Sequence, residues 1–360
     1  MQRLLFIIIC FVTLDCAWPC TSAIVSGKVT ANGRPMLWKH RDTGTEDNFV
    51  QRVVAARPGE LDYVALFNAG DSLLAEAWIG LNSAGFAVMN TASYNLVPDT
   101  AVYRDREGYV MTLALKQCRS LADFEMLLDT LSRPMGVQAN FGAIDASGAG
   151  AYYETCDDGY VKYDLADAPD GVLVRTNYSC SGASDTGFGY IREANACHLL
   201  SPYVTSASVE PATFTEVLSR SFYHSMLKCD ALAGNPEWII DQDFIPRNSS
   251  SASIVVEGLL PGESPESAVM WSAVGYPPCS YVLPVTVADV PEELQPSPST
   301  WRSKLCDDVV ARKRKVFPVT RGSGSHYINV EALRHYNDSC RQVSLENYRI
   351  NKELLNRKYK

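Results

Sequence analysis

The feature that most constrains the fold of this chain is a series of short β-prone segments that come in pairs around glycine-containing turns. Three such pairs are predicted to be hairpins: residues 21–30 with 36–40, 77–81 with 86–90, and 141–145 with 151–155. The first pair flanks Asn32-Gly33, and Asn-Gly is a strong signal for a tight turn. Further strands are predicted at residues 171–176, 253–257 and 280–287. This pattern predicts antiparallel sheets.

Helical patterns lie between these groups of strands. Apolar residues recur at three- to four-residue spacing in four segments: residues 109–119, 121–132, 213–227 and 329–355. Hairpins that are grouped together, with helices segregated from them, indicate an α+β fold of sheets covered by helices rather than alternating βαβ units.

One stretch, residues 291–298 (PEELQPSP), has the composition of a linker. It separates a strand-rich body, residues 20–290, from a helical C-terminal extension, residues 291–360, which we expect to pack on the same domain. The extension contains the basic run Arg312-Lys313-Arg314-Lys315, which we expect to be a solvated helix face.

The composition excludes several classes of protein. The 360 residues are 46% hydrophobic and 20% charged, which is typical of a globular protein with a sizeable core and not of a disordered chain or a multi-pass membrane protein. The net charge of −9 argues against a nucleic-acid partner, because such proteins usually carry a basic surface. The oligomeric state stays open, and a homo-oligomer is compatible with the sequence.

Residues 1–19 (MQRLLFIIICFVTLDCAWP) have the pattern of a leader. Arg3 precedes an apolar run, residues 4–14, that is too short to span a bilayer and fits the apolar region of a secretory signal peptide. We therefore predict a signal peptide with a short pro-segment, and an exported protein, periplasmic or extracellular, without a stable membrane span after processing.

Several reactive side chains are predicted to gather at one end of the first hairpin. A turn centred on Asn-Gly places Asp42 opposite Ala23, within roughly 10 Å of Cys20 at about 3.3 Å per strand residue. Lys39 and Arg41 lie on the same segment as Asp42. A thiol, a carboxylate and two cations therefore share one end of the hairpin.

If processing leaves Cys20 as the first residue, its α-amine, with a reference pKa near 8, can accept the thiol proton. That supplies a nucleophile and its base in one residue. Asp42 is then a candidate to orient the α-ammonium, and Lys39 or Arg41 to stabilise the thiolate or a substrate anion. The sequence contains neither HExxH nor paired CxxC motifs, so we expect no metal ion and no cofactor.

These residues resemble the N-terminal-nucleophile hydrolases of the choloylglycine hydrolase, penicillin V acylase and acid ceramidase group, and the related isopenicillin N acyltransferase-type enzymes. The signature of that group is an opening Cys-Thr, here Cys20-Thr21, followed by a strand, a glycine turn and a second strand that ends in a basic residue and Asp. Relatives of the bile salt hydrolase type read Gly-Arg-Asn-Met-Asp there, whereas this chain reads Trp38-Lys39-His40-Arg41-Asp42. By its distance from the Asp, Lys39 takes the place of the relatives' Arg, with Arg41 as the alternative.

Two later segments extend the resemblance. Residues 80–86 (GLNSAGF) look like the group's G-(M/L)-N-x-x-G-(L/F) hairpin, and Asn90 follows where relatives place an oxyanion-hole Asn. Val174-Arg175-Thr176-Asn177 resembles their L-T-N-N segment, whose Asn helps to order the site. The arginine usual in bile salt hydrolases has no clear match here, and Arg192 lies two or three positions away from it. The resemblance spans residues 20–290 and implies an αββα sandwich of two antiparallel sheets between helix layers.

The sequence therefore predicts an exported cysteine amidase that hydrolyses carbon–nitrogen bonds in small linear amides through a thioester, with bile salts, penicillin V or N-acyl amino acids as candidate substrates. Relatives with a pro-segment remove it through attack by the same cysteine, and the resemblance predicts such autoproteolytic processing here. An acyltransferase that passes the acyl group to an amine is the first alternative. A non-catalytic secreted binding protein on the same scaffold is the second, and a peptidase of the dipeptidase branch is a weaker one. Each site residue also has a local alternative: a disulfide or buried cysteine for Cys20, a turn cap for Asp42, solvated charges for Lys39 and Arg41, and backbone hydrogen bonding for Asn90 and Asn177.

Eleven cysteines are an unusual number for such a chain. Cys10 and Cys16 lie in the predicted leader, and Cys20 is the predicted nucleophile. The others form an even set that can pair fully in an exported protein or include buried free thiols: Cys118, Cys156, Cys180, Cys197, Cys229, Cys279, Cys306 and Cys340.

Overall fold

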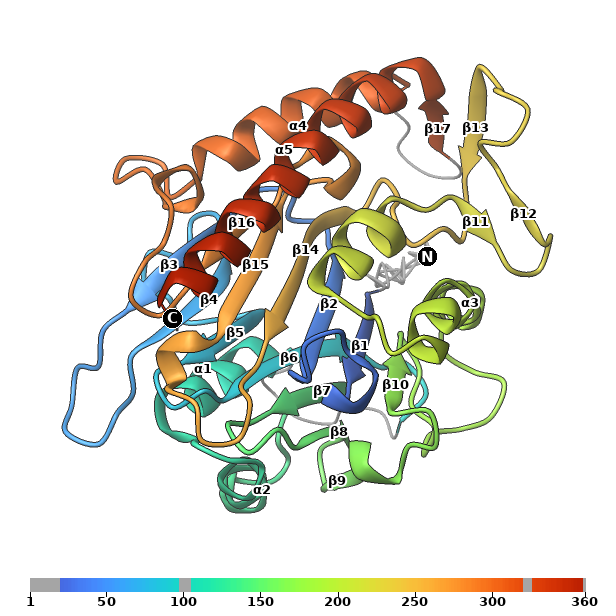
Figure 1. Ribbon diagram of the computed structural model, residues 1–360. Helices are drawn as coiled ribbons and strands as arrows, with labels where there is room; N and C mark the ends of the chain where they lie inside the picture. Colours follow the sequence, from blue (N-terminus) through green and yellow to red (C-terminus); the bar gives the residue numbers. More distant parts are fainter. Residues whose placement is uncertain (1–19, 97–104, 320–325, 359–360) are drawn as a thin grey trace, which may run out of the picture.

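The structure, a computed structural model, describes residues 20–96, 105–319 and 326–358, so the predicted leader, residues 1–19, lies outside the described residues. Two large antiparallel sheets dominate the described chain (Figure 1). The first sheet has the strand order β10-β1-β2-β14-β15-β16, and the second has the order β3-β4-β5-β6-β7-β8-β9. Among the described residues, no helix is both long and apolar enough to cross a bilayer.

The strands of the first sheet are β1 (Thr21–Val25), β2 (Met36–Asp42), β10 (Val172–Arg175), β14 (Ser250–Glu257), β15 (Val269–Val274) and β16 (Leu283–Val285). Those of the second sheet are β3 (Asn48–Val53), β4 (Tyr63–Asn68), β5 (Ile79–Asn82), β6 (Ala87–Ala92), β7 (Ala139–Ile144), β8 (Gly150–Thr155) and β9 (Tyr160–Asp164). Two small ribbons pair β11 (Tyr223–His224) with β12 (Cys229–Asp230) and β13 (Trp238–Asp241) with β17 (His326–Asn329). The helices are α1 (Glu107–Gln117), α2 (Leu121–Thr130), α3 (Tyr190–Thr205), α4 (Lys304–Val316) and α5 (Val330–Lys358).

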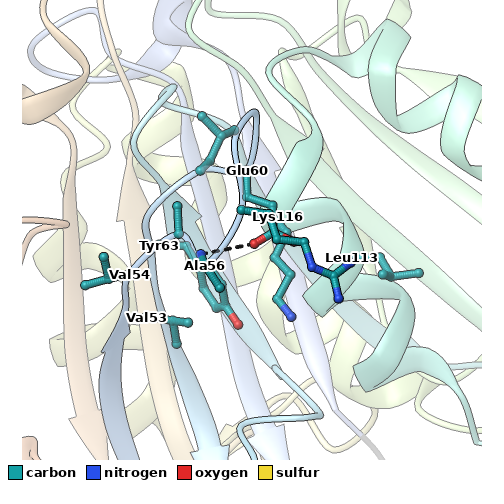
Figure 2. Close-up of a pocket in the computed structure, with 10 residues that line it drawn as sticks. Val53, Val54, Ala56, Glu60, Tyr63, Leu113 and Lys116 are labelled. Atoms are coloured by element: carbon teal, nitrogen blue, oxygen red, sulfur yellow. Dashed lines mark hydrogen bonds between the residues drawn. The ribbon is translucent and has the colours of Figure 1, made fainter.

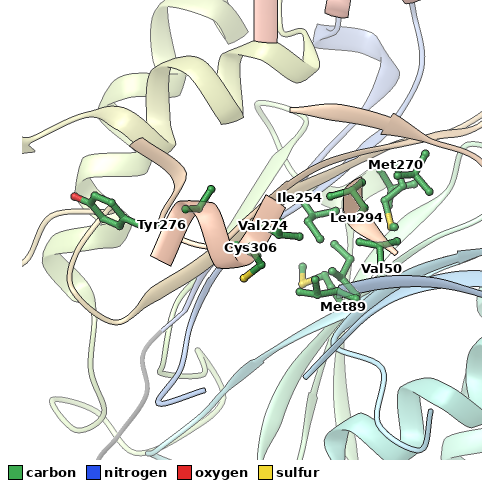
Figure 3. Close-up of a cluster of buried hydrophobic side chains, with 14 of the residues drawn as sticks. Val50, Met89, Ile254, Met270, Val274, Tyr276, Leu294 and Cys306 are labelled. Carbon is green, nitrogen blue, oxygen red and sulfur yellow. The ribbon is translucent and has the colours of Figure 1, made fainter. Parts of the chain in front are cut away.

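Three apolar clusters hold these elements in four layers. The cluster between the sheets joins Val50 and Met89 of the second sheet to Ile254 and Met270 of the first (Figure 3). A second cluster packs α1 and α2 against the second sheet, and a third packs α3 against the first sheet. The predicted α+β class and the αββα layering are therefore confirmed.

Successive side chains of β2 lie on opposite faces of the sheet, and this determines where the predicted site residues point. Every residue of β2 is buried, because this strand lies inside the first sheet with a layer on either face. Leu37 packs into the cluster between the sheets, whereas Met36 and Trp38 pack into the cluster under α3. Side chains alternate along a strand, so Lys39 and Arg41 face the second sheet, and His40 and Asp42 face the helical layer.

The first predicted hairpin is present, but its register differs from the prediction. Thr21 lies opposite His40 and Ser22 opposite Lys39, so Asp42 is not opposite Ala23; instead it lies beyond the level of Cys20. The strands end at Val25 and resume at Met36, because the connection contains a 3₁₀ turn, Gly27–Val29, rather than a two-residue Asn-Gly turn. The other two predicted hairpins are confirmed as β5–β6 and β7–β8.

The prediction of a helix at residues 213–227 is wrong for the second half of this segment. The helical part is short. It consists of a π-helical segment, Thr213–Val217, and one 3₁₀ turn, Leu218–Arg220, after which the chain enters β11. Helix α3 and the strands β3 and β4 were not predicted from the sequence.

We expected the basic run at residues 312–315 to be a solvated helix face, and this prediction is wrong for its first two residues. The Lys313 ammonium is buried and forms an ion pair with Glu46 Oε1 at 2.5 Å. The Arg312 guanidinium donates to the carbonyl oxygen of Cys279 at 3.0 Å. Helix α4, which carries the run, also supplies apolar side chains to the cluster between the sheets, among them Leu305 and Val309. These contacts join residues 304–316 to the strand-rich body.

None of the nine cysteines among the described residues forms a disulfide. Full pairing of the eight cysteines after Cys20 is therefore absent from this structure. The alternative of buried free thiols holds for Cys118, Cys279, Cys306 and Cys340.

Candidate active site

Cys20 lies immediately before β1, at the end of the first sheet where β2 also ends. Its thiol Sγ lies 3.7 Å from the backbone carbonyl oxygen of Asp42, and the residue is 6% exposed. Cys20 and the segment 39–42 are therefore neighbours, as the spacing predicts, even though the register of the hairpin differs. The polar side chains around Cys20 fall into two groups, one on each face of β2.

On the face toward the second sheet, Lys39 is paired with Asn90 of β6. Lys39 Nζ lies 2.6 Å from Asn90 Oδ1 and 2.8 Å from the carbonyl oxygen of Trp78. Because an ammonium group can only donate, the Asn90 oxygen faces Lys39 and its NH₂ group points away. Among the described residues nothing accepts a hydrogen bond from that NH₂ group.

Burial determines the electrostatics of Lys39. The side chain is 1% exposed, and desolvation lowers the pKa of its ammonium to about 7, although the nearby Cys20 raises it. Lys39 therefore titrates near neutral pH, unlike an ordinary lysine.

Arg41 faces the same sheet but is held away from Asn90. Its guanidinium donates to Asn48 Oδ1 at 2.6 Å and to Asn68 Oδ1 at 2.8 Å, and its Cζ lies 4.8 Å from the centroid of the Trp78 ring. Of the two cations that the sequence offers, Lys39 is the one that contacts the candidate oxyanion donor.

On the opposite face of β2, Asp42 is the acceptor for an arginine from a distant loop. Arg247 donates to Asp42 Oδ2 from Nε at 3.0 Å and from a terminal nitrogen at 2.9 Å. Ser250 Oγ donates to Asp42 Oδ1 at 2.6 Å. Asp42 as a whole residue is 2% exposed, so this arrangement fixes the position of its carboxylate within the buried layer.

His40 lies beside Asp42 and is held by two serines. Its ring nitrogens lie 3.1 Å from Ser219 Oγ and 2.8 Å from Ser250 Oγ. Desolvation lowers the pKa of the imidazole to about 4, so the ring is neutral at neutral pH. A neutral ring hydrogen-bonded to two hydroxyls is a structural group here.

Arg192 of α3 joins Cys20 to Asn177. It donates to the carbonyl oxygen of Cys20, to Thr21 Oγ1 at 2.9 Å and to Asn177 Oδ1 at 2.9 Å. Asn177 Nδ2 in turn donates to the carbonyl oxygen of Ala92, two residues after Asn90. Both ends of the Asn177 amide are occupied, so Asn177 orders the site rather than offering a free donor.

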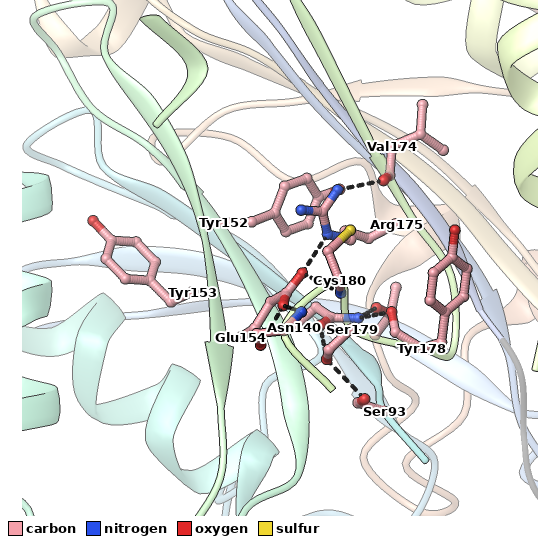
Figure 4. A network of polar contacts seen from close by, with 12 residues as sticks. Ser93, Asn140, Tyr152, Tyr153, Glu154, Val174, Arg175, Tyr178, Ser179 and Cys180 are labelled. Carbon is pink, nitrogen blue, oxygen red and sulfur yellow. Dashed lines mark hydrogen bonds and ion pairs between the residues drawn. The ribbon is translucent and has the colours of Figure 1, made fainter. Parts of the chain in front are cut away.

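A buried polar network anchors the segment that carries Asn177 (Figure 4). Asn140 Nδ2 donates to the carbonyl oxygens of Thr176 and Tyr178, on either side of Asn177. Arg175 Nε donates to Glu154 Oε1 at 2.8 Å, which ties the end of β10 to β8. The position of Asn177 is therefore fixed by both sheets.

Three residues of the site were not predicted from the sequence: Trp78, Arg247 and Ser250. The only signal for Arg247 was its place just before the predicted strand at residues 253–257, since strand ends commonly carry functional side chains. Trp78 lies two residues before the GLNSAGF motif, and Ser250 lies in a serine run with no distinguishing pattern.

Two cavities lie elsewhere in the molecule. One, of 260 Å³, lies between the β3–β4 connection and the end of α1, and Val53, Tyr63, Leu113 and Lys116 line it (Figure 2). The other, of 790 Å³, follows β10 and α3. Cys20 lines neither of them.

Comparison with known proteins gives structural matches only. No family model matches the chain, and no curated protein matches its sequence. The structure is similar to a variant of the conjugated bile acid hydrolase from Clostridium perfringens, with 9% identity, a TM-score of 0.47, and coverage of 76% of this chain and 94% of that one. It is also similar to penicillin V acylase from Agrobacterium tumefaciens, with 13% identity, a TM-score of 0.40, and coverage of 75% and 87%. A third match is the N-acylethanolamine-hydrolyzing acid amidase ortholog of Caenorhabditis elegans, with 13% identity, a TM-score of 0.40, and coverage of 69% and 98%.

Bile acid hydrolase and penicillin V acylase are two of the enzyme types that the sequence resemblance named. At these identities and TM-scores the similarity concerns the fold alone.

Proposed function

We propose that this protein is an exported N-terminal cysteine amidase that hydrolyses the carbon–nitrogen bond of a small linear amide. The observation that carries the proposal is the position of Cys20 between two buried polar groups. Lys39 and Asn90 lie on one face of β2, and Asp42 with Arg247 lies on the other. Arg192 joins the Cys20 backbone to Asn177.

In the proposed reaction, removal of residues 1–19 frees the α-amine of Cys20. That amine accepts the thiol proton, and the thiolate forms a sulfur–carbon bond with the amide carbonyl carbon. The carbonyl oxygen becomes an oxyanion, which accepts a hydrogen bond from the Asn90 NH₂ group.

Collapse of this intermediate breaks the carbon–nitrogen bond. The leaving amine takes the proton from the α-ammonium, and a thioester remains on Cys20. Water then attacks the thioester carbonyl with the α-amine as base, which releases a carboxylic acid and restores the thiol. Asp42, held by Arg247 and Ser250, is the proposed orienting group for the α-ammonium.

The N-terminus of the secreted protein is the first test. We expect a start at Cys20 by Edman sequencing or intact mass, and any other start contradicts the mechanism. We expect Cys20→Ala to abolish turnover and acylation by a thiol-directed acyl probe, whereas Cys118→Ala, a change at a buried thiol of the second sheet's helical layer, should leave both unchanged.

The substrate class requires a screen. Bile acid conjugates, penicillin V, N-acyl amino acids and N-acyl amides should be compared by release of the free amine. Transfer of the acyl group to an added amine would instead identify an acyltransferase, and a folded protein that no probe acylates at Cys20 would be a binding protein.

A further inference from the structure

Trp78, which directly precedes β5, contacts the Lys39–Asn90 pair in two ways. Its carbonyl oxygen accepts a hydrogen bond from Lys39 Nζ at 2.8 Å, and Lys39 Nζ lies 5.7 Å from the centroid of its indole ring. Arg41 Cζ lies 4.8 Å from the centroid of the same ring. One aromatic ring therefore contacts two cations that lie on the same face of β2.

The buried ammonium group of Lys39 is stabilised by its contact with the indole ring. In the described part of the chain, Lys39 has no ion pair with a carboxylate, and its two hydrogen-bond acceptors are neutral. The groups that act on it are Cys20 and Glu107, which favour the charged form, and Arg41, which disfavours it. The negative face of an indole ring stabilises a desolvated cation and compensates in part for burial.

We propose that Trp78 is a positioning residue, whose ring and carbonyl hold the Lys39 ammonium charged against Asn90 so that the Asn90 NH₂ group stays turned toward the substrate. The inference rests on the proposed function, because it concerns the same Cys20 site. A neutral Lys39 amine would be able to accept a hydrogen bond as well as donate one. The Asn90 amide would then be free to rotate, and the site would lose its oriented donor.

The test is the pH dependence of kcat/KM for an N-acyl aminomethylcoumarin amide. The α-amine of Cys20, with a reference pKa near 8, also affects the rate in this range, so each profile is divided by that of the same protein carrying Lys39→Arg. Burial lowers the pKa of Lys39 to about 7, so we expect this ratio to fall for the wild type as the pH rises above that value. In Trp78→Leu, which lacks the ring, we expect this fall to begin roughly half a pH unit to one unit lower. Trp78→Phe keeps an aromatic face and should give a smaller shift in the same direction.

The same substitution in a Lys39→Arg background separates this role from a purely structural one. A guanidinium stays charged throughout this pH range, so Trp78→Leu should leave the alkaline side of the profile unchanged there. Trp238→Leu, a change at a half-exposed tryptophan of β13, serves as the control and should match the wild type.

The outcomes of this test distinguish failure of the proposed function from failure of the proposed role of Trp78. If the acyl probe does not modify Cys20 in the wild type, the proposed function fails. If Cys20 is acylated but the Trp78→Leu and Trp78→Phe profiles superimpose on the wild type, the role of Trp78 is overturned. An equal shift in the Lys39→Arg background would also overturn it. If Trp78→Leu does not fold, Trp78→Phe alone decides between these outcomes.

Discussion

Arg247 and Asp42 meet across 205 positions of sequence, with two guanidinium nitrogens within 3.0 Å of one carboxylate oxygen. The carboxylate side chain is fully buried and the arginine is 16% exposed. A charge pair of this kind is costly to break, because one partner then loses the opposite charge beside it while it stays largely buried.

Asp42→Asn should therefore destabilise the protein by about 3 kcal/mol, since it leaves Arg247 without its carboxylate. The matched control is Asp47→Asn, which breaks the partly exposed pair with Arg302 and should cost less than about 1 kcal/mol. Urea unfolding at neutral pH measures both values. Equal effects for the two variants would mean that the Asp42–Arg247 pair adds no stability.

Asn90→Asp tests the proposed oxyanion donor without removing the partner of Lys39. The new carboxylate still accepts from Lys39, but the NH₂ group is gone, so we expect kcat to fall by about a hundredfold or more. Asn68→Asp makes the same change beside Arg41 and should keep most of the activity. Comparable losses in the two variants would contradict the assignment of Asn90.

Arg192→Lys tests the connection between α3 and Cys20. Lysine cannot reproduce the geometry by which Arg192 donates to Cys20, Thr21 and Asn177 together, so we expect slower appearance of the processed N-terminus and a drop in kcat of at least about tenfold. The control is Arg349→Lys on the exposed face of α5. Intact mass over time and steady-state kinetics provide the two readouts, and wild-type values in both would contradict this role.

Because His40 is buried, we expect the free energy of unfolding to decrease in mild acid. The pKa of His40 is lowered to about 4 by burial, with Asp42 opposing and Arg247 and Arg192 adding to the shift. The unfolded chain therefore binds a proton that the folded chain does not as the pH falls from about 6.5 to 4, which costs up to about 3 kcal/mol.

The comparison variant is His40→Gln, which has an amide in place of the titrating ring. Its unfolding free energy should fall less steeply than that of the wild type between pH 6.5 and 4. Parallel slopes would show that His40 does not titrate on unfolding in this range.

Much of the fold was predictable from local pattern. The hairpins β5–β6 and β7–β8 come from β-prone segments a few residues apart, so neighbouring residues alone define them. The register of β1 with β2 was not predictable in this way, because a 3₁₀ turn takes up part of the connection. The π-helical segment at Thr213–Val217 and the strand that follows it likewise depend on packing and not on local apolar spacing.

For the site, the sequence by itself determined which reactive groups lie near Cys20, because Lys39, Arg41 and Asp42 lie on the strand paired with it. It also marked Asn90 and Asn177 by their motifs. The tertiary structure alone decided the partners: Lys39 rather than Arg41 beside Asn90, Arg247 on Asp42, and Arg192 between Cys20 and Asn177. The physical reason is that strand alternation and the stacking of two sheets fix which side chains meet, and residues distant in sequence supply the compensation that each buried charge requires.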